Sequence, residues 1–597
     1  MEYNIKIRDG PARIGEFLLD NRKIVTPNIL FLDTKRFKAI NLADVLITNS
    51  KIQKDKLTLK ISNQFFYPKD MPKELNLALI KKYKKETKEY CIIPGNEEII
   101  DQTLKDNTAC FFIVGNASQL FDQPKKFVDF IIKLRQRIGY EKILYLPSIG
   151  DPTCFALLAY MGVDLFDSTK AIIAARNNTL LFADGNYKKS DLDELPCSCP
   201  ICKKWKNTPS ELMFMDILNH NYFMMLNEIK QVRNSIKNNN IRNLVETRVK
   251  SNPTLTSILR NLDQNHYSFL EKRTPVISKT KIIATSKESL NRPEIKRFQK
   301  RVIERYRKPK SSKVLVLLPC SAKKPYSFSK SHHMFLEKIL SSGNPSMIHE
   351  VIITSPIGLV PRELELIYPA SAYDIPVTGI WDEDEKKMIR EMLTSYLKLN
   401  KYDEIIVHLP REIVEFIKDL MHKAIITCIN SPTSQESLEE FSKVLKEKVK
   451  SYKPVKNQAR ILDNIASTLS YQFGKEVSEK ILKNCVIRGK YPYQKIIYKK
   501  TQLGMVTEPR GFISFTIDGA SKIADSNNYW VKIYDDFNLK GSVFSPGVKD
   551  ADENIRIGDE VVVIRNNKLC AVGVAQMNGE EMKNSSHGEA VKVRHRV

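Results

Sequence analysis

Two hydrophobic patterns alternate in the middle of the chain, between residues 313 and 445. Apolar runs at helical spacing predict helices at 383–399 and 411–422. Short apolar runs bounded by turn residues predict buried strands at 313–319, 350–356, 403–410 and 424–429. This alternation is typical of a mainly parallel, doubly wound sheet with helices on both faces, and ligands bind such sheets at the carboxyl ends of their strands.

The segments that flank this α/β core have other patterns. Residues 1–235 mix short buried strands with helical repeats and predict a further α/β module. Residues 236–312 are polar and basic and predict a helical linker. Residues 446–525 predict a small α+β module. Residues 526–597 contain short strands separated by turn signals, which predict a small β-barrel.

The charge balance changes this picture by suggesting a partner. The 597 residues include 95 Lys and Arg against 69 Asp and Glu, a formal net charge of +26. Such a charge on a folded chain favours a polyanion, most often nucleic acid, although a lysine-rich proteome is an alternative explanation. The pattern predicts neither a membrane span nor a signal peptide. We therefore expect a cytoplasmic protein without membrane contact.

One stretch concentrates the positive charge. Residues 294–313 combine helical periodicity with nine lysines and arginines that include Arg301 and Arg305. A basic helix of this kind is either a solvated face or a contact to RNA, and the pattern does not separate the two.

A cysteine cluster indicates a metal site. Cys197, Cys199 and Cys202 form a C-x-C-x-x-C turn, and His220 follows as a candidate fourth ligand. Three thiolates and one imidazole suit Zn²⁺ in a closed structural site, because zinc prefers tetrahedral sulfur and nitrogen ligands. Reactive thiols or another metal are the alternatives.

A polar segment follows the first core strand. It places Cys320 at the end of the strand, with lysines close behind and a predicted helix beginning soon after. A cation or a helix N-terminus activates a thiol. From the residues alone, a nucleophilic Cys320 and a strand-end cysteine beside an ordinary polar turn are equally compatible with the pattern.

The same segment resembles a known family. The signature P-C-x3-K-P-Y-x2-S-x2-H of archaeosine synthase is matched at every fixed position, which implies catalytic roles for Cys320, Lys324, Tyr326, Ser329 and His332. The following stretch, 354–385, is also similar to the family core. The resemblance implies a catalytic domain at 313–445 and substrate-binding roles for Ser355, Arg362, Glu363, Asp374 and Trp381.

The flanking modules extend the resemblance over most of the chain. Residues 1–235 are similar to a tRNA-guanine transglycosylase module, which binds a structural zinc ion. The resemblance implies Cys197, Cys199, Cys202 and His220 as its ligands. Within residues 446–525, the stretch LSYQFG at 469–474 resembles the accessory module of archaeal transglycosylases. Residues 526–597 resemble a PUA domain, an RNA-binding barrel, with Pro546 and Gly547 on its pattern.

The resemblance implies a reaction on tRNA. The family adds an amine to the nitrile of 7-cyano-7-deazaguanine in the D-arm, giving an amidine. Free lysine is the expected donor, with a radical S-adenosylmethionine partner that cleaves the adduct to archaeosine; glutamine or ammonia as a direct donor is the older interpretation. The sequence does not determine the oligomeric state, and a homodimer is one of the states compatible with it.

One departure limits the transglycosylase resemblance. Asp167 is at the position of the transglycosylase nucleophile, but the base-binding motif has no counterpart, and the segment is too short for a complete eight-stranded barrel. We therefore expect a degenerate TIM-barrel-like module in which Asp167 packs or caps. An active transglycosylase and a non-catalytic tRNA-binding protein are the alternative functions.

Overall fold

A computed structural model describes most of the chain. The residues described are 3–19, 22–48, 57–59, 72, 74–78, 81, 90–105, 108–205, 208–421, 423–508, 510–524 and 528–597. The chain divides into two compact units, one of residues 1–274 with 584–588 and the other of residues 275–583 with 589–597. Within the described ranges no helix has the length and apolar character that crossing a membrane requires.

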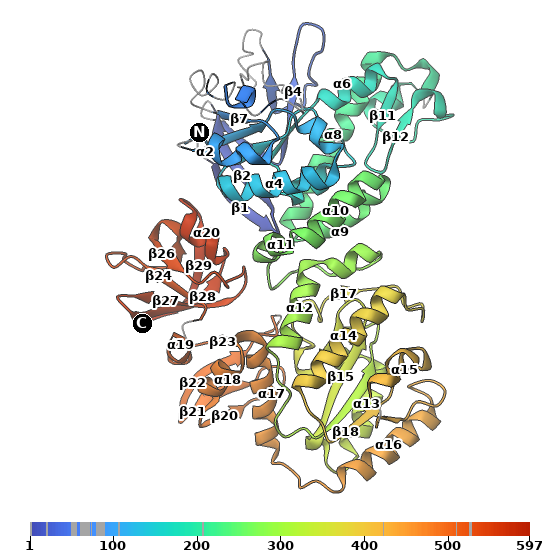
Figure 1. The fold of residues 1–597 in the computed structure, drawn as a ribbon, viewed down its shortest axis with the longest axis vertical. Helices are drawn as coiled ribbons and strands as arrows, with labels where there is room; N and C mark the ends of the chain where they lie inside the picture. Colours follow the sequence, from blue (N-terminus) through green and yellow to red (C-terminus); the bar gives the residue numbers. More distant parts are fainter. Residues whose placement is uncertain are drawn as a thin grey trace. The chain divides into compact units, whose positions relative to one another are not determined.

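A seven-stranded sheet forms the centre of the first unit (Figure 1). Its strands pair in parallel in the order β6-β5-β4-β10-β9-β8-β7, so the described part is an open half-barrel. A separate antiparallel sheet has the order β1-β2-β3. The strands are β1 (Tyr3–Asp9), β2 (Ala12–Leu19), β3 (Arg22–Thr26), β4 (Asn28–Leu32), β5 (Val45–Ile47), β6 (Leu57–Leu59), β7 (Tyr90–Ile93), β8 (Phe111–Val114), β9 (Ile143–Tyr145) and β10 (Leu165–Asp167).

Helices cover this sheet and complete the first unit. The hairpin β11 (Thr179–Leu181) and β12 (Asn186–Lys188) precedes the long helix α8. Helix α10 packs on α4 through buried leucines and isoleucines, so residues 236–274, expected in a linker, belong to the core of this unit. The helices are α2 (Ile100–Leu104), α3 (Ala117–Phe121), α4 (Pro124–Ile138), α5 (Phe155–Tyr160), α6 (Thr169–Arg176), α7 (Pro200–Lys204), α8 (Phe214–Lys237), α9 (Ile241–Arg248), α10 (Pro253–Asn265) and α11 (Tyr267–Arg273).

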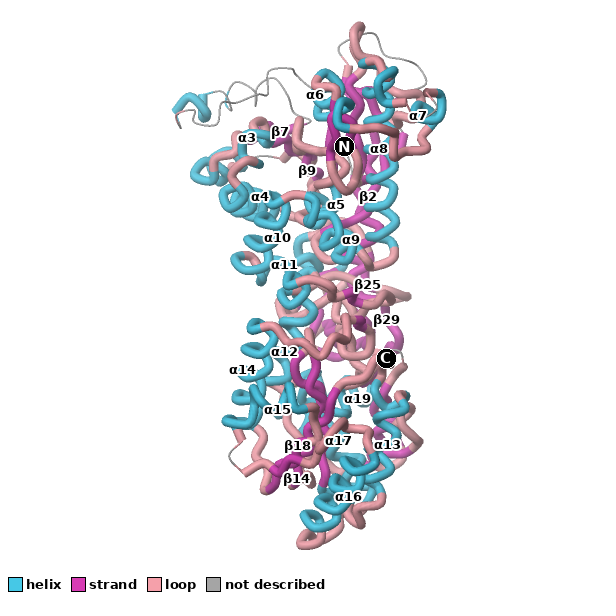
Figure 2. Tube along the Cα trace, turned by 90° about the vertical axis from the view of Figure 1, so that its right-hand side faces the viewer, coloured by secondary structure: helices cyan, strands magenta, loops and turns pink. Residues whose placement is uncertain are grey.

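The second unit contains the doubly wound sheet, in the order β16-β15-β14-β18-β19. All its pairs are parallel except β15 with the edge strand β16. Side chains of β14 alternate between two cores: one holds α12, α14 and α15, the other α13 and α16, and Figure 2 shows these helix layers on opposite sides of β14. The strands are β14 (Val314–Pro319), β15 (Ile348–Thr354), β16 (Gly358–Pro361), β18 (Glu404–Val407) and β19 (Ile425–Ile426).

The helices of this core follow the predicted alternation. Helix α14 begins at a reciprocal cap, in which Asp382 accepts from the Glu385 amide and Glu385 accepts from the Asp382 amide. Helix α15 is shorter than predicted and continues as a 3-10 turn, Lys418–Leu420. The helices are α12 (Pro293–Glu304), α13 (Lys330–Leu340), α14 (Glu383–Leu399), α15 (Arg411–Ile417) and α16 (Gln435–Val449); the short pair β13 (Ile282–Ile283) and β17 (Tyr373–Asp374) lies beside them.

Helix α12 corrects the expectation for the basic stretch. Arg301 is buried, at 6% exposure, with its guanidinium 5.9 Å from the centre of the Tyr471 ring. Arg305 is half-buried and donates to the Tyr529 hydroxyl at 2.8 Å. The helix is therefore neither a solvated face nor an exposed RNA contact at Arg301, because this side chain is inside the unit.

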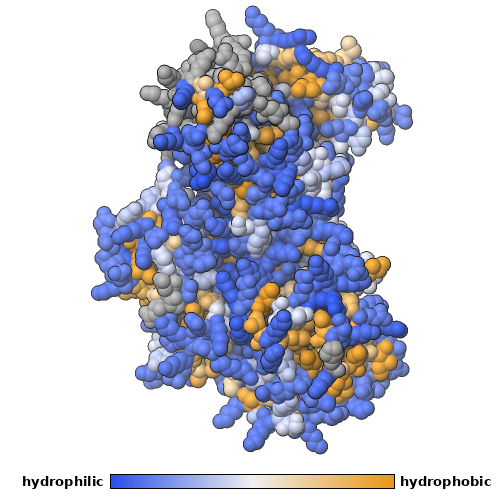
Figure 3. Space-filling model, in the orientation of Figure 1, coloured by the Kyte–Doolittle hydropathy of each residue, from blue (hydrophilic) through white to orange (hydrophobic). Residues whose placement is uncertain are grey.

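Two further modules share one hydrophobic cluster at the end of the chain. The first has the sheet β20-β21-β22-β23, and the second is a six-stranded barrel-like sheet, β25-β29-β28-β27-β24-β26. Polar residues dominate the face seen in Figure 3, with apolar patches mainly over the second unit. The elements are α17 (Asn457–Phe473), α18 (Lys475–Leu482), β20 (Cys485–Arg488), β21 (Lys495–Tyr498), β22 (Thr501–Val506), β23 (Ile513–Phe515), α19 (Ile517–Ala524), β24 (Trp530–Ile533), β25 (Val543–Phe544), β26 (Val548–Ala551), β27 (Glu560–Arg565), β28 (Lys568–Ala575), α20 (Gly579–Asn584) and β29 (Glu589–Arg596).

Candidate active site

The cysteine of the motif lies directly after the central strand β14. Pro319 at the end of β14 pairs with Ile353 of β15, so Cys320 and Thr354 leave neighbouring parallel strands at the same edge of the sheet. Cys320 is half-buried. This carboxyl-end edge is where doubly wound sheets bind ligands, as the sequence predicted.

A chain of hydroxyl groups lies beside this cysteine. The Tyr326 hydroxyl is 2.6 Å from the Tyr373 hydroxyl, which is 2.5 Å from the Thr354 hydroxyl. The Lys324 ammonium lies 4.1 Å from the centre of the Tyr373 ring. Lys324 and Tyr326 of the motif therefore both contact Tyr373, although Tyr373 is distant from them in the sequence.

Burial tunes the protonation of these groups. Desolvation, followed by the fields of Tyr373 and Cys320, raises the pKa of Tyr326 well above its ordinary value, and burial likewise raises the pKa of Tyr373. Burial also lowers the pKa of Lys324, against the opposing influence of Cys320 and Asp374. The two phenols therefore remain proton donors at neutral pH, whereas Lys324 releases its proton more readily than an exposed lysine.

The remaining motif residues hold the frame of the site. The Ser329 hydroxyl accepts from the His332 amide at 3.3 Å and so caps the N-terminus of α13. His332 Nε2 lies 3.0 Å from the Pro319 carbonyl oxygen, and Nδ1 lies 2.8 Å from Nη2 of Arg362. A neutral imidazole that donates from Nε2 and accepts at Nδ1 satisfies both contacts. His332 thereby ties α13 to the end of β14, next to Cys320.

His332 makes the stability of the protein depend on pH. Burial, reinforced by the charge of Arg362, lowers the pKa of His332 from 6.5 to about 3. Between these values the unfolded chain binds a proton that the folded chain does not, so stability falls as the pH decreases from about 6.5 toward 3. At pH 5 this difference corresponds to about 2 kcal/mol of unfolding free energy.

The variant His332→Asn should therefore lose about 2 kcal/mol less stability than the wild type between pH 7.5 and pH 5. Urea unfolding at both pH values measures this difference. His333→Asn is the matched control, because the His333 side chain is exposed on the same helix and should keep the wild-type pH response. An equal response in both variants would show that His332 is not the buried neutral group described here.

The substrate-binding residues expected between 354 and 385 separate into two groups. Arg362 and Glu363 are on the short 3-10 turn Arg362–Leu364 and face the interior. Ser355 is buried and donates to Glu385 at the start of α14. Asp374 is exposed, and Trp381 is half-buried with its ring 5.7 Å from that of Phe416. The structure therefore does not gather all five around Cys320.

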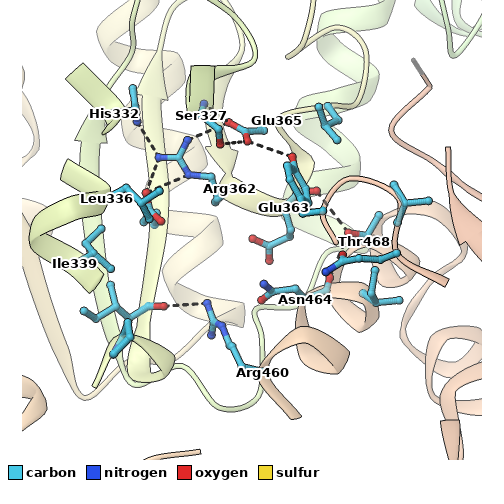
Figure 4. A pocket seen from close by; sticks show the side chains of 18 of the residues that line it. Ser327, His332, Leu336, Ile339, Arg362, Glu363, Glu365, Arg460, Asn464 and Thr468 are labelled. Atoms are coloured by element: carbon cyan, nitrogen blue, oxygen red, sulfur yellow. Dashed lines mark hydrogen bonds and ion pairs between the residues drawn. The ribbon is translucent and has the colours of Figure 1, made fainter. Parts of the chain in front are cut away.

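Arg362 and Glu363 line a charged cavity of about 300 Å³ (Figure 4). Arg362 pairs with Glu350 of β15 and, at 3.0 Å, with Glu365. Glu365 also accepts from the Tyr491 hydroxyl at 3.2 Å. Sequence reasoning missed Glu350, Glu365 and Tyr491, because they come from a strand, a turn and a distant module that carry no shared motif.

Comparisons with known proteins assign these parts. Family models match at residues 295–445 (Domain of unknown function, DUF5591), 82–254 (Queuine tRNA-ribosyltransferase) and 536–597 (PUA domain). Archaeosine synthase subunit alpha of Methanosarcina acetivorans is 38% identical over 81% of this chain and 79% of that protein. The chain belongs to the archaeosine synthase family. Archaeosine synthase of Haloferax volcanii is 37% identical, over 84% of this chain and 85% of its own length.

This archaeosine synthase family member also resembles a related enzyme. A tRNA-guanine(15) transglycosylase of Methanothermobacter thermautotrophicus is 30% identical over 79% of this chain and 68% of that protein. The expected fold class is confirmed: a multidomain α/β and α+β chain with a transglycosylase-like N-terminal module, here with an open half-barrel sheet, and a C-terminal PUA domain.

The candidate metal site of this family member lies in its transglycosylase-like module. The ligand atoms of Cys197, Cys199, Cys202 and His220 all lie within 4.8 Å of one another. His220 directs Nδ1 toward Cys202 Sγ at 3.4 Å, while Nε2 is 3.3 Å from the Leu181 carbonyl oxygen, which orients the ring. Three sulfur atoms and one nitrogen at this spacing fit a tetrahedral metal ion.

Asp167 makes contacts that are compatible with the packing or capping role expected from the sequence. Its carboxylate accepts from the Tyr145 hydroxyl at 2.6 Å and from the Ser148 and Thr169 amides at 2.8 Å. The residue is 2% exposed. A buried carboxylate that accepts three hydrogen bonds on both oxygens has the contacts of a capping and packing group.

The two PUA residues have different surroundings. Pro546 is exposed. Gly547 is buried, its carbonyl oxygen accepts from the Tyr534 amide at 3.1 Å, and a Cβ at this position would lie 2.5 Å from the Phe537 ring. Pro546 is thus available to a ligand, whereas Gly547 allows the close approach of the backbone to Phe537.

Proposed function

We propose that this protein acts in archaeosine biosynthesis on tRNA, adding an amine to the nitrile of 7-cyano-7-deazaguanine in the D-arm. Free lysine is the proposed donor, and a radical S-adenosylmethionine partner then cleaves the lysine adduct to archaeosine. The observation that supports this proposal is the convergence of Cys320, Lys324 and Tyr326, three fixed residues of the family motif, at the carboxyl end of the central strand.

The proposed chemistry begins with Cys320. Lys324 or a water takes the thiol proton, and the sulfur adds to the electrophilic nitrile carbon, so that a C–S bond forms and one C–N π bond breaks. The nitrogen of the resulting thioimidate takes a proton from Lys324 or through the Tyr326 hydroxyl chain. The positive charge of Lys324 beside the site stabilises negative charge as it develops.

The second step releases the enzyme. The neutral donor amine attacks the thioimidate carbon, the C–S bond breaks, and the sulfur leaves with a proton as the thiol. The product is an amidine, so atoms and electrons balance without an oxidant or reductant. In this scheme Ser329 and His332 hold the position of Cys320 and do not transfer protons.

The other modules have binding roles in the proposal. The PUA domain, with Pro546 on its surface, holds the tRNA backbone while the α/β core addresses one unstacked base. Zn²⁺ is the metal proposed for Cys197, Cys199, Cys202 and His220, where it would stabilise the hairpin and α8 of the transglycosylase-like module.

The direct test is to incubate the pure protein with nitrile-bearing tRNA and free lysine, and then to measure the nucleoside mass. The proposal expects a mass increase of one lysine. A gain corresponding to ammonia, with glutamine or ammonia as the only effective donor, would instead support the direct route. Exchange of labelled guanine into tRNA would favour a transglycosylase, and no chemical change would favour a non-catalytic tRNA-binding protein.

A further inference from the structure

A polar cavity lies in the first unit, at the amino ends of the parallel strands β4, β5 and β6. It measures about 600 Å³, which is within the range of small-molecule sites. Its walls come from β3, the start of β4, the loop before β5, the first residue of β6 and helix α8. The fold therefore brings five separate segments together around one space.

This cavity is at the other end of the strands from Asp167. Asn28, the first residue of β4, pairs with Leu165, the first residue of β10, whereas Asp167 ends β10. Barrels of this kind carry their reactions at the carboxyl ends of the strands, and their amino ends usually serve stability alone. Neither the position of the transglycosylase nucleophile nor the proposed reaction at Cys320 accounts for the cavity.

Positive charge predominates in the lining of the cavity. Arg22, Lys23 and Arg233 contribute three cations and Asp44 contributes one carboxylate, which gives a net charge of +2. The Glu16 carboxylate lies 3.6 Å from Lys23, but a second lysine, on β1, lies 3.9 Å from the same carboxylate. The nearby acidic groups therefore leave an excess of positive charge, which attracts an anion.

Arg233 of α8 is the most deeply placed of the three cations. It is half-buried, whereas Arg22 and Lys23 are exposed. Its Nη1 donates to the Pro27 carbonyl oxygen at 3.0 Å, and it makes no other hydrogen bond or ion pair to the described residues. Desolvation lowers the pKa of Arg233, an effect that the Asp44 carboxylate opposes. A guanidinium carries five N–H donors, so most of its hydrogen-bonding capacity is left for a ligand.

Asn28 provides a second unused donor. The residue is 3% exposed and lines the cavity. Its Oδ1 accepts from the Ile29 amide at 2.8 Å, while Nδ2 has no hydrogen-bond partner in the part of the chain that the structure describes. Buried polar groups are nearly always hydrogen-bonded, so an unused donor in a cavity indicates an acceptor that the cavity receives.

The chemistry of these donors favours one class of anion. A phosphate group offers several acceptor oxygens, of which a guanidinium binds two in its fork and an amide binds another. A phosphate monoester carries a charge close to −2 at neutral pH, as do two consecutive phosphates of an RNA backbone. Either charge balances the +2 of the lining, whereas a single carboxylate ligand balances only half of it.

From these features we infer that the cavity binds phosphate, carried either by an RNA chain or by a small phosphate ester. Arg233 holds two phosphate oxygens and Asn28 donates to a third, while Arg22 and Lys23 attract the ligand from the rim. The inference goes beyond the proposed function, because it assigns a ligand to the end of the first unit that the reaction does not use.

Calorimetric titration of the full chain with inorganic phosphate, at constant ionic strength in chloride, is the direct test. Arg233→Gln removes the charge and the fork of donors, and should weaken phosphate binding at least about tenfold. Lys237→Gln is the matched control. It removes one positive charge from an exposed position of the same helix that is outside the lining, and should keep the wild-type affinity.

Asn28→Asp tests the site without changing Arg233, whose bond to Pro27 also contributes to the fold. Aspartate has nearly the same shape and still accepts from the Ile29 amide, but it places a carboxylate oxygen where Nδ2 donates. Phosphate binding should again weaken at least about tenfold. The melting temperature of each variant shows that the protein is folded.

Binding of tRNA at several salt concentrations distinguishes the two sources of phosphate. If an RNA chain carries it, Arg233→Gln should weaken tRNA binding at least about tenfold and reduce the slope of log Kd against log salt by about one, whereas Lys237→Gln changes neither. If a small ester carries it, Arg233→Gln should lose inorganic phosphate and bind tRNA normally. Phosphate and tRNA binding that are both insensitive to Arg233→Gln and Asn28→Asp would overturn the inference.

Discussion

Cys320→Ala is expected to lower amidine formation on nitrile-bearing tRNA at least about 10³-fold, because the variant removes the proposed nucleophile. The tRNA affinity should stay within about twofold of the wild type, since the proposed contacts to the tRNA backbone are in the PUA domain and do not involve Cys320. Nucleoside mass spectrometry measures the product, and filter binding measures the affinity.

Cys428→Ala is the matched control for this prediction. Both cysteines are half-buried and both follow strands of the α/β core, Cys320 after β14 and Cys428 after β19. The control should therefore keep wild-type turnover. Near-normal turnover in Cys320→Ala would instead show that the thiol only lines the pocket.

A covalent intermediate gives this prediction a second readout. Without a donor amine, the wild-type protein should accumulate a thioimidate with nitrile-bearing tRNA, visible as a protein–tRNA species on a denaturing gel. Cys320→Ala should give none, and added amine should release the wild-type species. An absence of this species in the wild type, together with full turnover, would exclude the covalent route.

The second large effect is expected at the candidate metal site. Cys197→Ser should lower the metal content of the purified protein, because a hydroxyl replaces one of the three thiolates among the candidate ligands. A structural zinc contributes folding free energy directly. A loss on the order of 5 kcal/mol would lower the melting temperature of the first unit by about 10 °C or more.

Metal analysis and thermal unfolding check this expectation, with Cys110→Ser as the control. Cys110 is a half-buried cysteine of the same unit that lies outside the cluster, so its variant should retain both the metal and the melting temperature. Undiminished zinc in Cys197→Ser would contradict the ligand assignment. Chelation of the wild type should reproduce the lower melting temperature.

The candidate metal site and the candidate active site differ in how many of their residues could be predicted from the sequence. The candidate metal cluster could be predicted because its three cysteines are close in the chain. Only His220 is distant from them in the sequence. Cys320, Lys324 and Tyr326 could be identified as candidate site residues for the same reason, because they belong to one short motif after an apolar strand. Their partner Tyr373 reaches them only because β15 and the following turns bring it back to the carboxyl edge of the sheet.

The basic helix shows where local pattern fails. Charge and periodicity at 294–313 are the same for a helix on the surface and for one whose arginines are stacked and hydrogen-bonded inside the protein. The side chain of Arg301 is buried because α12 packs against the accessory module, where the Tyr471 ring provides its partner, while Arg305 donates to Tyr529 of the C-terminal barrel. Only the tertiary packing distinguishes these two outcomes.

The sequence by itself determined most elements, the candidate metal ligands and the motif, since strand and helix periods and closely spaced ligands are local properties. Tertiary structure alone decided which motif residues lie beside Tyr373 and which hold α13 against the end of β14. It also created the charged cavity, where Glu350, Glu363 and Glu365 meet Arg460 and Asn464 of a separate helix. The physical reason is that charge balance and burial depend on neighbours in space, and these come from segments that share no pattern along the chain.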